Sequence, residues 1–149
     1  MNEVIALPLV SDTEALGERL AALMLPGDLV ILDGPLGAGK TALTRGIGRG
    51  LGVEGVASPT FVFARIHTDG RLPLVHVDAY RLSGFDDLDA LDLDATLEES
   101  VTVVEWGSGV VERLSEDYLV VELRRAELTE QRTARLLPHG ERWQQRLVD

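Results

Sequence analysis

The amino-acid sequence predicts a single α/β domain spanning residues 1–149, with three layers built around a central sheet of mixed parallel and antiparallel strands. Three observations lead to that expectation. The short apolar run Leu29 to Asp33 has the pattern of a strand buried on both faces. A glycine-rich loop and a segment with helical spacing follow it directly. Further along, two strand-like segments flank a turn sequence, which adds a hairpin to the sheet.

The first elements are expected to be a strand and an amphipathic helix. Residues 4–10 (VIALPLV) have strand character. Ser11 and Glu14 stand at the two positions of a capping box, so a helix over residues 12–24 is expected with Ser11 as its N-cap. The apolar residues of this helix recur at helical spacing: Leu16, Leu20 and Leu23.

A second helix is expected from about Lys40 to Leu51, after the glycine-rich loop. Its buried face is marked by Leu43, Ile47 and Leu51. Gly46, Gly48 and Gly50 lie within it, and each glycine costs roughly 1 kcal/mol relative to alanine in a helix interior. Close packing of this helix against the sheet, or a frayed last turn, would account for them.

The remaining elements follow from turn and strand signals. Asp-Gly in the turn 68–71 predicts an antiparallel hairpin between the strands 61–67 and 72–78. The acidic segment 83–100 is expected to form a short helix and a loop. The later segments are expected to be a buried strand at 101–106, a strand pair at 117–125 and 131–138, and a terminal helix at 140–148.

Composition limits the classes of protein to consider. The 149 residues are 45% hydrophobic and include no cysteine, which excludes disulfides, thiolate metal sites and cysteine nucleophiles. The N-terminus has no basic region of the kind that signal peptides carry, and no apolar run reaches the length of a membrane span. We therefore expect a cytoplasmic protein with no membrane contact.

Net charge bears on the partners. Fourteen basic against twenty-five acidic residues give a net charge of -11, which argues against tight, direct binding of nucleic acid over a broad face. A role in a nucleic-acid pathway through a partner protein stays open.

The glycine-rich loop matches the P-loop pattern of Gly, four residues, then Gly-Lys-Ser/Thr, and so predicts the P-loop NTPase fold with a bound nucleotide, which is ATP or ADP if the base is adenine. In such a loop, backbone N–H groups surround a phosphate and the following helix directs its positive end at the same anion. Lys40 is expected to reach the β- and γ-phosphates, and the Thr41 hydroxyl to bind Mg²⁺. The nucleotide-binding residues are Gly34, Pro35, Leu36, Gly37, Ala38, Gly39, Lys40 and Thr41.

Two strand-end carboxylates are candidates for the catalytic and metal site. Asp78 ends one apolar strand and Glu105 another, and a P-loop site needs such an acid for Mg²⁺ and its waters. Glu105 is also a candidate to orient the attacking water. Which acid holds the metal directly stays open, and the alternative for either is a surface pair or a cap.

Two other polar residues lie in these motifs, and one motif is absent from the sequence. Thr60, in the loop 57–61, resembles a switch threonine that senses the γ-phosphate, although a local turn bond is the alternative. His76 is interpreted as a structural histidine, since no other His or Cys is spaced to complete a metal site. The sequence has no Asn-Lys-x-Asp element, and this absence favours adenine over guanine.

The motifs together resemble the TsaE (YjeE) family, the bacterial ATPases of tRNA threonylcarbamoyladenosine biosynthesis. GPLGAGKT, SPTF, HVDAYRL and VVEWG occur here in that family's order and spacing, between Leu29 and about Val111. The resemblance implies Mg²⁺-ATP binding, slow hydrolysis, and work alongside a TsaD–TsaB pair, with tRNA reached through that pair. It maps phosphate and metal contacts onto Lys40 and Thr41, a switch-like loop onto Thr60, and the acids onto Asp78 and Glu105. Tyr80, Arg81 and Trp106 match further motif positions.

One departure from the family pattern stands after Trp106. Family members commonly carry another acid shortly after the Glu-Trp pair, whereas this chain has Gly107 and Ser108. Two other functions are considered beside the ATPase: a small-molecule or nucleotide kinase, which would need an acceptor pocket and a lid, and a nucleotide-gated binding module with negligible hydrolysis.

Overall fold

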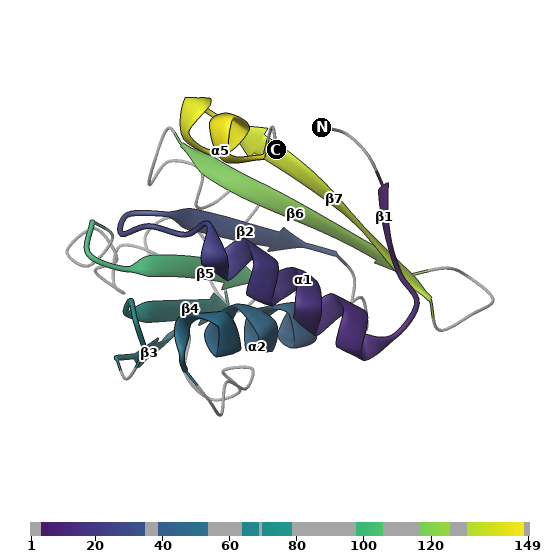
Figure 1. The fold of residues 1–149 in the computed structure, drawn as a ribbon, viewed down its shortest axis with the longest axis horizontal. Helices are drawn as coiled ribbons and strands as arrows, with labels where there is room; N and C mark the ends of the chain where they lie inside the picture. The colour runs from purple at the N-terminus through teal and green to yellow at the C-terminus, as the bar shows by residue number, and fades with distance from the viewer. Residues whose placement is uncertain are drawn as a thin grey trace.

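The computed structural model describes residues 4–34, 39–53, 64–68, 70–78, 98–105, 117–125 and 131–147. In this part of the chain, seven strands form one sheet in the order β1-β7-β6-β2-β5-β4-β3 (Figure 1). The elements are β1 (Val4–Leu7), α1 (Val10–Ala22), β2 (Leu29–Asp33), α2 (Lys40–Leu51), β3 (Ala64–His67), β4 (Leu74–Asp78), β5 (Val101–Glu105), β6 (Tyr118–Arg125), β7 (Arg132–His139) and α5 (Glu141–Arg146).

The sheet combines a parallel centre with antiparallel margins. β2 pairs in parallel with both β5 and β6, and β5 pairs in parallel with β4. β3, β7 and β1 join by antiparallel pairing. Leu29 and Ile31 on one face of β2, and Val30 and Leu32 on the other, are all fully buried, so both faces of the central sheet are covered. The α/β class and the mixed sheet predicted from the sequence are confirmed.

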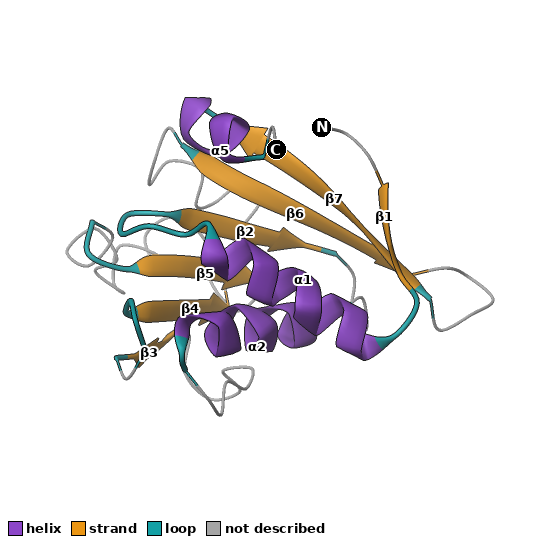
Figure 2. Ribbon diagram, in the orientation of Figure 1, coloured by secondary structure: helices purple, strands orange, loops and turns teal. Residues whose placement is uncertain are grey.

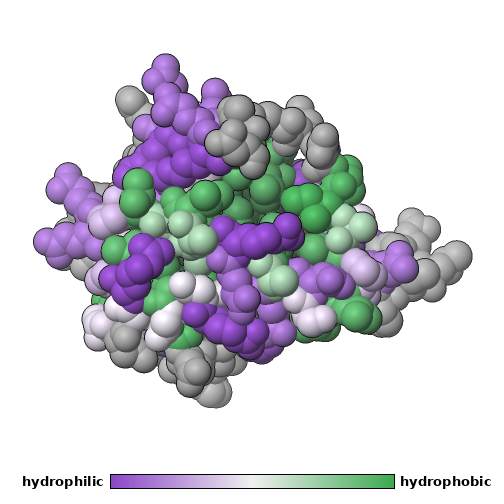
Figure 3. All heavy atoms as spheres, in the orientation of Figure 1, coloured by the Kyte–Doolittle hydropathy of each residue, from purple (hydrophilic) through white to green (hydrophobic). Residues whose placement is uncertain are grey.

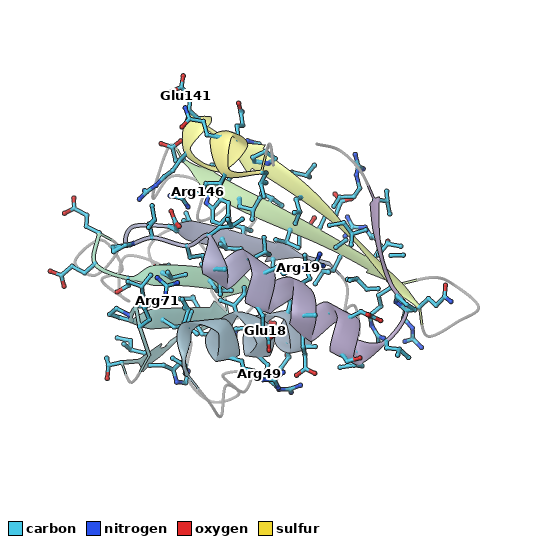
Figure 4. All side chains as sticks on the ribbon, in the orientation of Figure 1. Glu18, Arg19, Arg49, Arg71, Glu141 and Arg146 are labelled. Atoms are coloured by element: carbon cyan, nitrogen blue, oxygen red, sulfur yellow. The ribbon has the colours of Figure 1, made fainter. Side chains whose placement is uncertain are left out.

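Helices α1 and α2 lie side by side on one face of the sheet, with their backbones in close contact (Figure 2). A Cβ on Gly46 would lie 2.1 Å from the Glu14 carbonyl oxygen, and one on Gly17 would lie 2.4 Å from the Leu43 carbonyl oxygen. Gly46 is therefore needed for packing against α1 and not, as expected, for packing against the sheet. On the outer surface of this helix pair, Arg49 and Glu18 form an ion pair at 3.3 Å (Figure 4).

The start of α1 differs from the expectation. The strand ends at Leu7 and the helix begins at Val10, with Leu9 rather than Ser11 as its N-cap. The Leu9 N–H donates to the Asp12 carboxylate at 2.9 Å, and this bond replaces the capping box expected from Ser11. The helix also ends two residues early, so Leu23 is exposed and Met24 takes the buried position that Leu23 was expected to fill.

The other predicted elements are present within the described ranges. α2 has the expected bounds and buried face, β3 and β4 form the antiparallel hairpin, and β6 and β7 form the antiparallel pair. The acidic segment 83–100 lies outside the described residues except for its last three. No helix in the described part of the chain is long and apolar enough to cross a membrane.

Helix α5 is held at the turn between α1 and β2. Trp143 is fully buried and belongs to the main hydrophobic core. The Asp28 carboxylate has no exposed surface and forms ion pairs with Arg146 at 2.6 Å and with Arg142 at 3.2 Å. These contacts attach the C-terminal helix to the segment that leads into β2.

The edge of the helix-bearing face is less fully covered. Ile5 of β1 and Leu136 of β7 are only partly buried against the core. Hydrophobic residues accordingly show on the surface between α1 and strands β6 and β7 (Figure 3).

Candidate functional site

The two ends of the predicted P-loop lie where β2 ends and α2 begins. Gly34 follows β2 and is buried, and Gly39 is the N-cap of α2 with a φ of 105°, in the left-handed region that favours glycine. The Lys40 Nζ donates to the Gly34 carbonyl oxygen at 2.6 Å, which ties the second end of the loop to the first. Pro35, Leu36, Gly37 and Ala38 lie outside the described residues.

The first turn of α2 provides the environment of an anion site. The first hydrogen bond of the helix runs from the Leu43 N–H to the Gly39 carbonyl oxygen at 2.9 Å. The Thr44 hydroxyl donates to the Lys40 carbonyl oxygen, also at 2.9 Å. The N–H groups of a helix's first turn have no acceptor within the helix and attract anions. Lys40 is only 5% exposed, and a buried ammonium is stable only with polar or anionic partners. Thr41, the next residue, is half-buried.

The two predicted acids lie side by side at the carboxyl ends of neighbouring strands. Asp78 is the last residue of β4 and Glu105 the last of β5, and they are partners in the parallel register. On its other side Glu105 is opposite Leu32 of β2, two residues before Gly34. Neighbouring strands are about 5 Å apart, so Glu105 lies one strand away from the start of the P-loop.

Glu105 has a partner that the sequence interpretation did not identify. His76 is fully buried, and its Nε2 contacts the Glu105 Oε2, which is itself almost fully buried. The two residues lie on the same face because His76 is two positions before Asp78 on β4. The contact fixes the orientation of the Glu105 carboxylate. His76 and Asp78 are two positions apart in HVD and so share one face of the strand. The contact of His76 with Glu105 could be predicted from this only if β4 and β5 were known to be neighbours.

Several predicted residues cannot be placed. Asp78 is located by its backbone alone. Thr60, Tyr80, Arg81, Trp106 and Ser108 lie outside the described residues. Among the residues whose structure is described, no group of three or more His, Asp or Glu side chains is arranged to hold a metal ion. Of the predicted metal ligands, Glu105 and Thr41 are the two whose side chains the structure describes.

Comparisons with known proteins agree on one family. A family model described as threonylcarbamoyl adenosine biosynthesis protein TsaE matches residues 7–134. A Streptomyces coelicolor protein named tRNA threonylcarbamoyladenosine biosynthesis protein TsaE is 58% identical over 136 residues, which cover 86% of this chain and 91% of that protein. A Bacillus subtilis protein of the same name is 39% identical over 117 residues, which cover 77% and 73%. The crystal structure of Bacillus subtilis YdiB superposes with a TM-score of 0.78 at 31% identity and covers 96% of this chain and 89% of that one.

Proposed function

This chain belongs to the TsaE family, and from that premise we propose that it is the Mg²⁺-dependent, ATP-hydrolysing component of the tRNA threonylcarbamoyladenosine machinery. The observation that supports ATP binding is the position of Lys40. Its buried ammonium stands at the junction of the P-loop and α2, with the Glu105 carboxylate on the strand next to β2.

Each residue has a physical role in this proposal. Lys40 and the N-terminal end of α2 bind the β- and γ-phosphates. The Thr41 hydroxyl and a strand-end carboxylate, Asp78 or Glu105, hold Mg²⁺, which when bound neutralises charge on the phosphates. Their hard oxygen atoms suit that ion. His76 keeps the Glu105 carboxylate in one orientation. A carboxylate that positions an attacking water needs such a fixed orientation.

We further propose that turnover depends on a protein assembly. Phosphoryl transfer relies on positioning and on charge stabilisation, and an arginine supplied by a partner is worth roughly 10³- to 10⁵-fold in rate. The partners are TsaD-like and TsaB-like proteins, and this chain acts on tRNA indirectly through them. A net charge of -11 suits a cytoplasmic component that acts through proteins rather than on tRNA directly.

The test is steady-state phosphate release by the purified protein, alone and with a reconstituted TsaD-like and TsaB-like pair, ATP and tRNA. We expect slow release alone and faster release with the pair, and Thr60→Ala should reduce that gain. A pair that neither binds the chain nor changes its rate would refute the partner dependence.

Two sets of variants test the site itself. Lys40→Ala should weaken ATP binding in calorimetry and reduce phosphate release, because it removes the one ammonium next to the phosphates. Glu105→Gln should keep the fold and most of the nucleotide affinity while reducing hydrolysis, and Asp78→Asn should behave alike but more mildly. Normal turnover in both acid variants, with partners present, would exclude the assigned roles.

A further inference from the structure

Two side chains from distant parts of the sequence meet at the beginning of α2. Arg132 is the first residue of β7, and Thr13 lies in the first helical turns of α1. The position that a Cβ on Gly39 would take lies 3.3 Å from the Arg132 Cδ and 3.5 Å from the Thr13 Cγ2. Both side chains therefore lie against the glycine that precedes Lys40.

The register of β7 explains why Arg132 reaches this point. Side chains alternate along a strand, and Ala134 and Leu136 face the core beneath the helices. Arg132 shares their face, which is the face that carries α1 and α2. Arg135 is on the opposite face and pairs with Glu122 of β6 at 3.7 Å.

The strand order puts Arg132 and the acids on opposite sides of the loop. β5 and β4, which end in Glu105 and Asp78, lie on one side of β2, and β6 and β7 lie on the other. A metal ion on the β- and γ-phosphates belongs on the side of the carboxylates. The nucleoside end of a bound nucleotide must then leave the loop on the side of Arg132.

Thr13 adds an independent sign of an incomplete polar site. Its side chain is 1% exposed, and its hydroxyl has no hydrogen-bond partner in the described structure. A buried hydroxyl without a partner is unfavourable, and a ligand that bonds to it would remove that cost. The Thr13 methyl group lies against Gly39, and the hydroxyl is on the same Cβ atom, next to the proposed nucleotide site.

We propose that Arg132 contacts the nucleoside half of the nucleotide and that Thr13 positions that half. The planar guanidinium packs against the face of the base or bonds to the ribose, at the end of the nucleotide away from the phosphates that Lys40 is proposed to bind. A guanidinium suits this role because it stacks on aromatic rings and stays charged. The inference rests on the proposed function, since it assumes that this P-loop binds a nucleoside triphosphate.

The experiment compares ATP with inorganic triphosphate, which has the phosphates but no nucleoside. Calorimetry with Mg²⁺ and each ligand is run on the intact chain and on Arg132→Ala. We expect ATP affinity to fall about 10-fold or more, since a desolvated guanidinium–ring contact is worth up to about 2 kcal/mol, and triphosphate affinity to stay within about twofold. Thr13→Val, which keeps the shape and removes the hydroxyl, should show a smaller loss of the same selectivity.

Matched variants separate the explanations. Arg135→Ala, on the same strand but the opposite face, should bind both ligands as the unchanged chain does. Lys40→Ala should weaken both, and if it weakens neither, the proposed phosphate site itself is wrong. If Arg132→Ala binds ATP normally, or loses ATP and triphosphate equally while remaining folded by circular dichroism, the nucleoside contact is refuted.

Discussion

Gly46→Ala would test whether the close contact between α1 and α2 sets the position of the site. The added Cβ would lie 2.1 Å from the Glu14 carbonyl oxygen and 2.8 Å from the carbonyl carbon. Both atoms belong to the backbone of a helix, so no side chain can turn away to relieve the clash. The two helices must move apart by about 1 Å to restore ordinary contact, because protein interiors are close-packed.

The magnitude follows from two opposing effects. Inserting a methyl group into a packed interface costs about 1–3 kcal/mol, and a backbone clash belongs at the upper end. Alanine recovers about 1 kcal/mol through its higher helix propensity. We therefore expect a net loss of about 2 kcal/mol in the free energy of unfolding. Because α2 begins at Lys40, the same shift should also weaken ATP binding.

Urea denaturation followed by circular dichroism measures the first effect and calorimetry with ATP the second. Arg45→Ala is the control, since this neighbouring side chain is exposed and lies 3.6 Å from the Glu14 carboxylate. It should change stability by no more than about 0.5 kcal/mol. A Gly46→Ala protein as stable as the unchanged chain would refute the reasoning, because propensity would then outweigh the clash.

Two further changes test other contacts. Asp28→Ala removes the buried carboxylate that Arg142 and Arg146 contact and should lower the free energy of unfolding by about 2–3 kcal/mol in urea denaturation; an unchanged midpoint would show that these ion pairs do not hold α5. His76→Leu removes the contact to Glu105 and should reduce phosphate release while ATP affinity in calorimetry stays close to normal. His76→Gln, which retains an N–H donor, should recover part of the rate, and equal rates in all three proteins would contradict a positioning role.

Much of the fold could be predicted from local patterns. The run Leu29 to Leu32 is buried on both faces, as a parallel central strand must be, and α2 has the predicted bounds because the P-loop motif locates its first residue. The start of α1 could not be predicted correctly, because Asp12 and Glu14 are both acids suited to a capping box. Asp12 accepts from the Leu9 N–H, and the helix begins at Val10 rather than at residue 12.

The parts of the site that the sequence could not reveal depend on strand order. β2 lies between β5 and β6, although neither follows it directly in the chain. The contact of His76 with Glu105 and the position of Arg132 beside Gly39 both follow from that order. Spacing along the sequence contains no information on which distant strands become neighbours.

The pairing of β1 with β7 has a consequence for how the protein is made. Closing the loop from Val4 to Arg135 costs about 2–3 kcal/mol more in chain entropy than closing the turn between Arg125 and Arg132. The first strand must therefore wait, during synthesis, until β7 has left the ribosome. A nascent chain can assemble β2, α2 and the strands to β5 while its N-terminal strand still lacks a partner. Completion of this edge is thus a late folding step, and a chain shortened before β7 would leave β1 without the strand it pairs with.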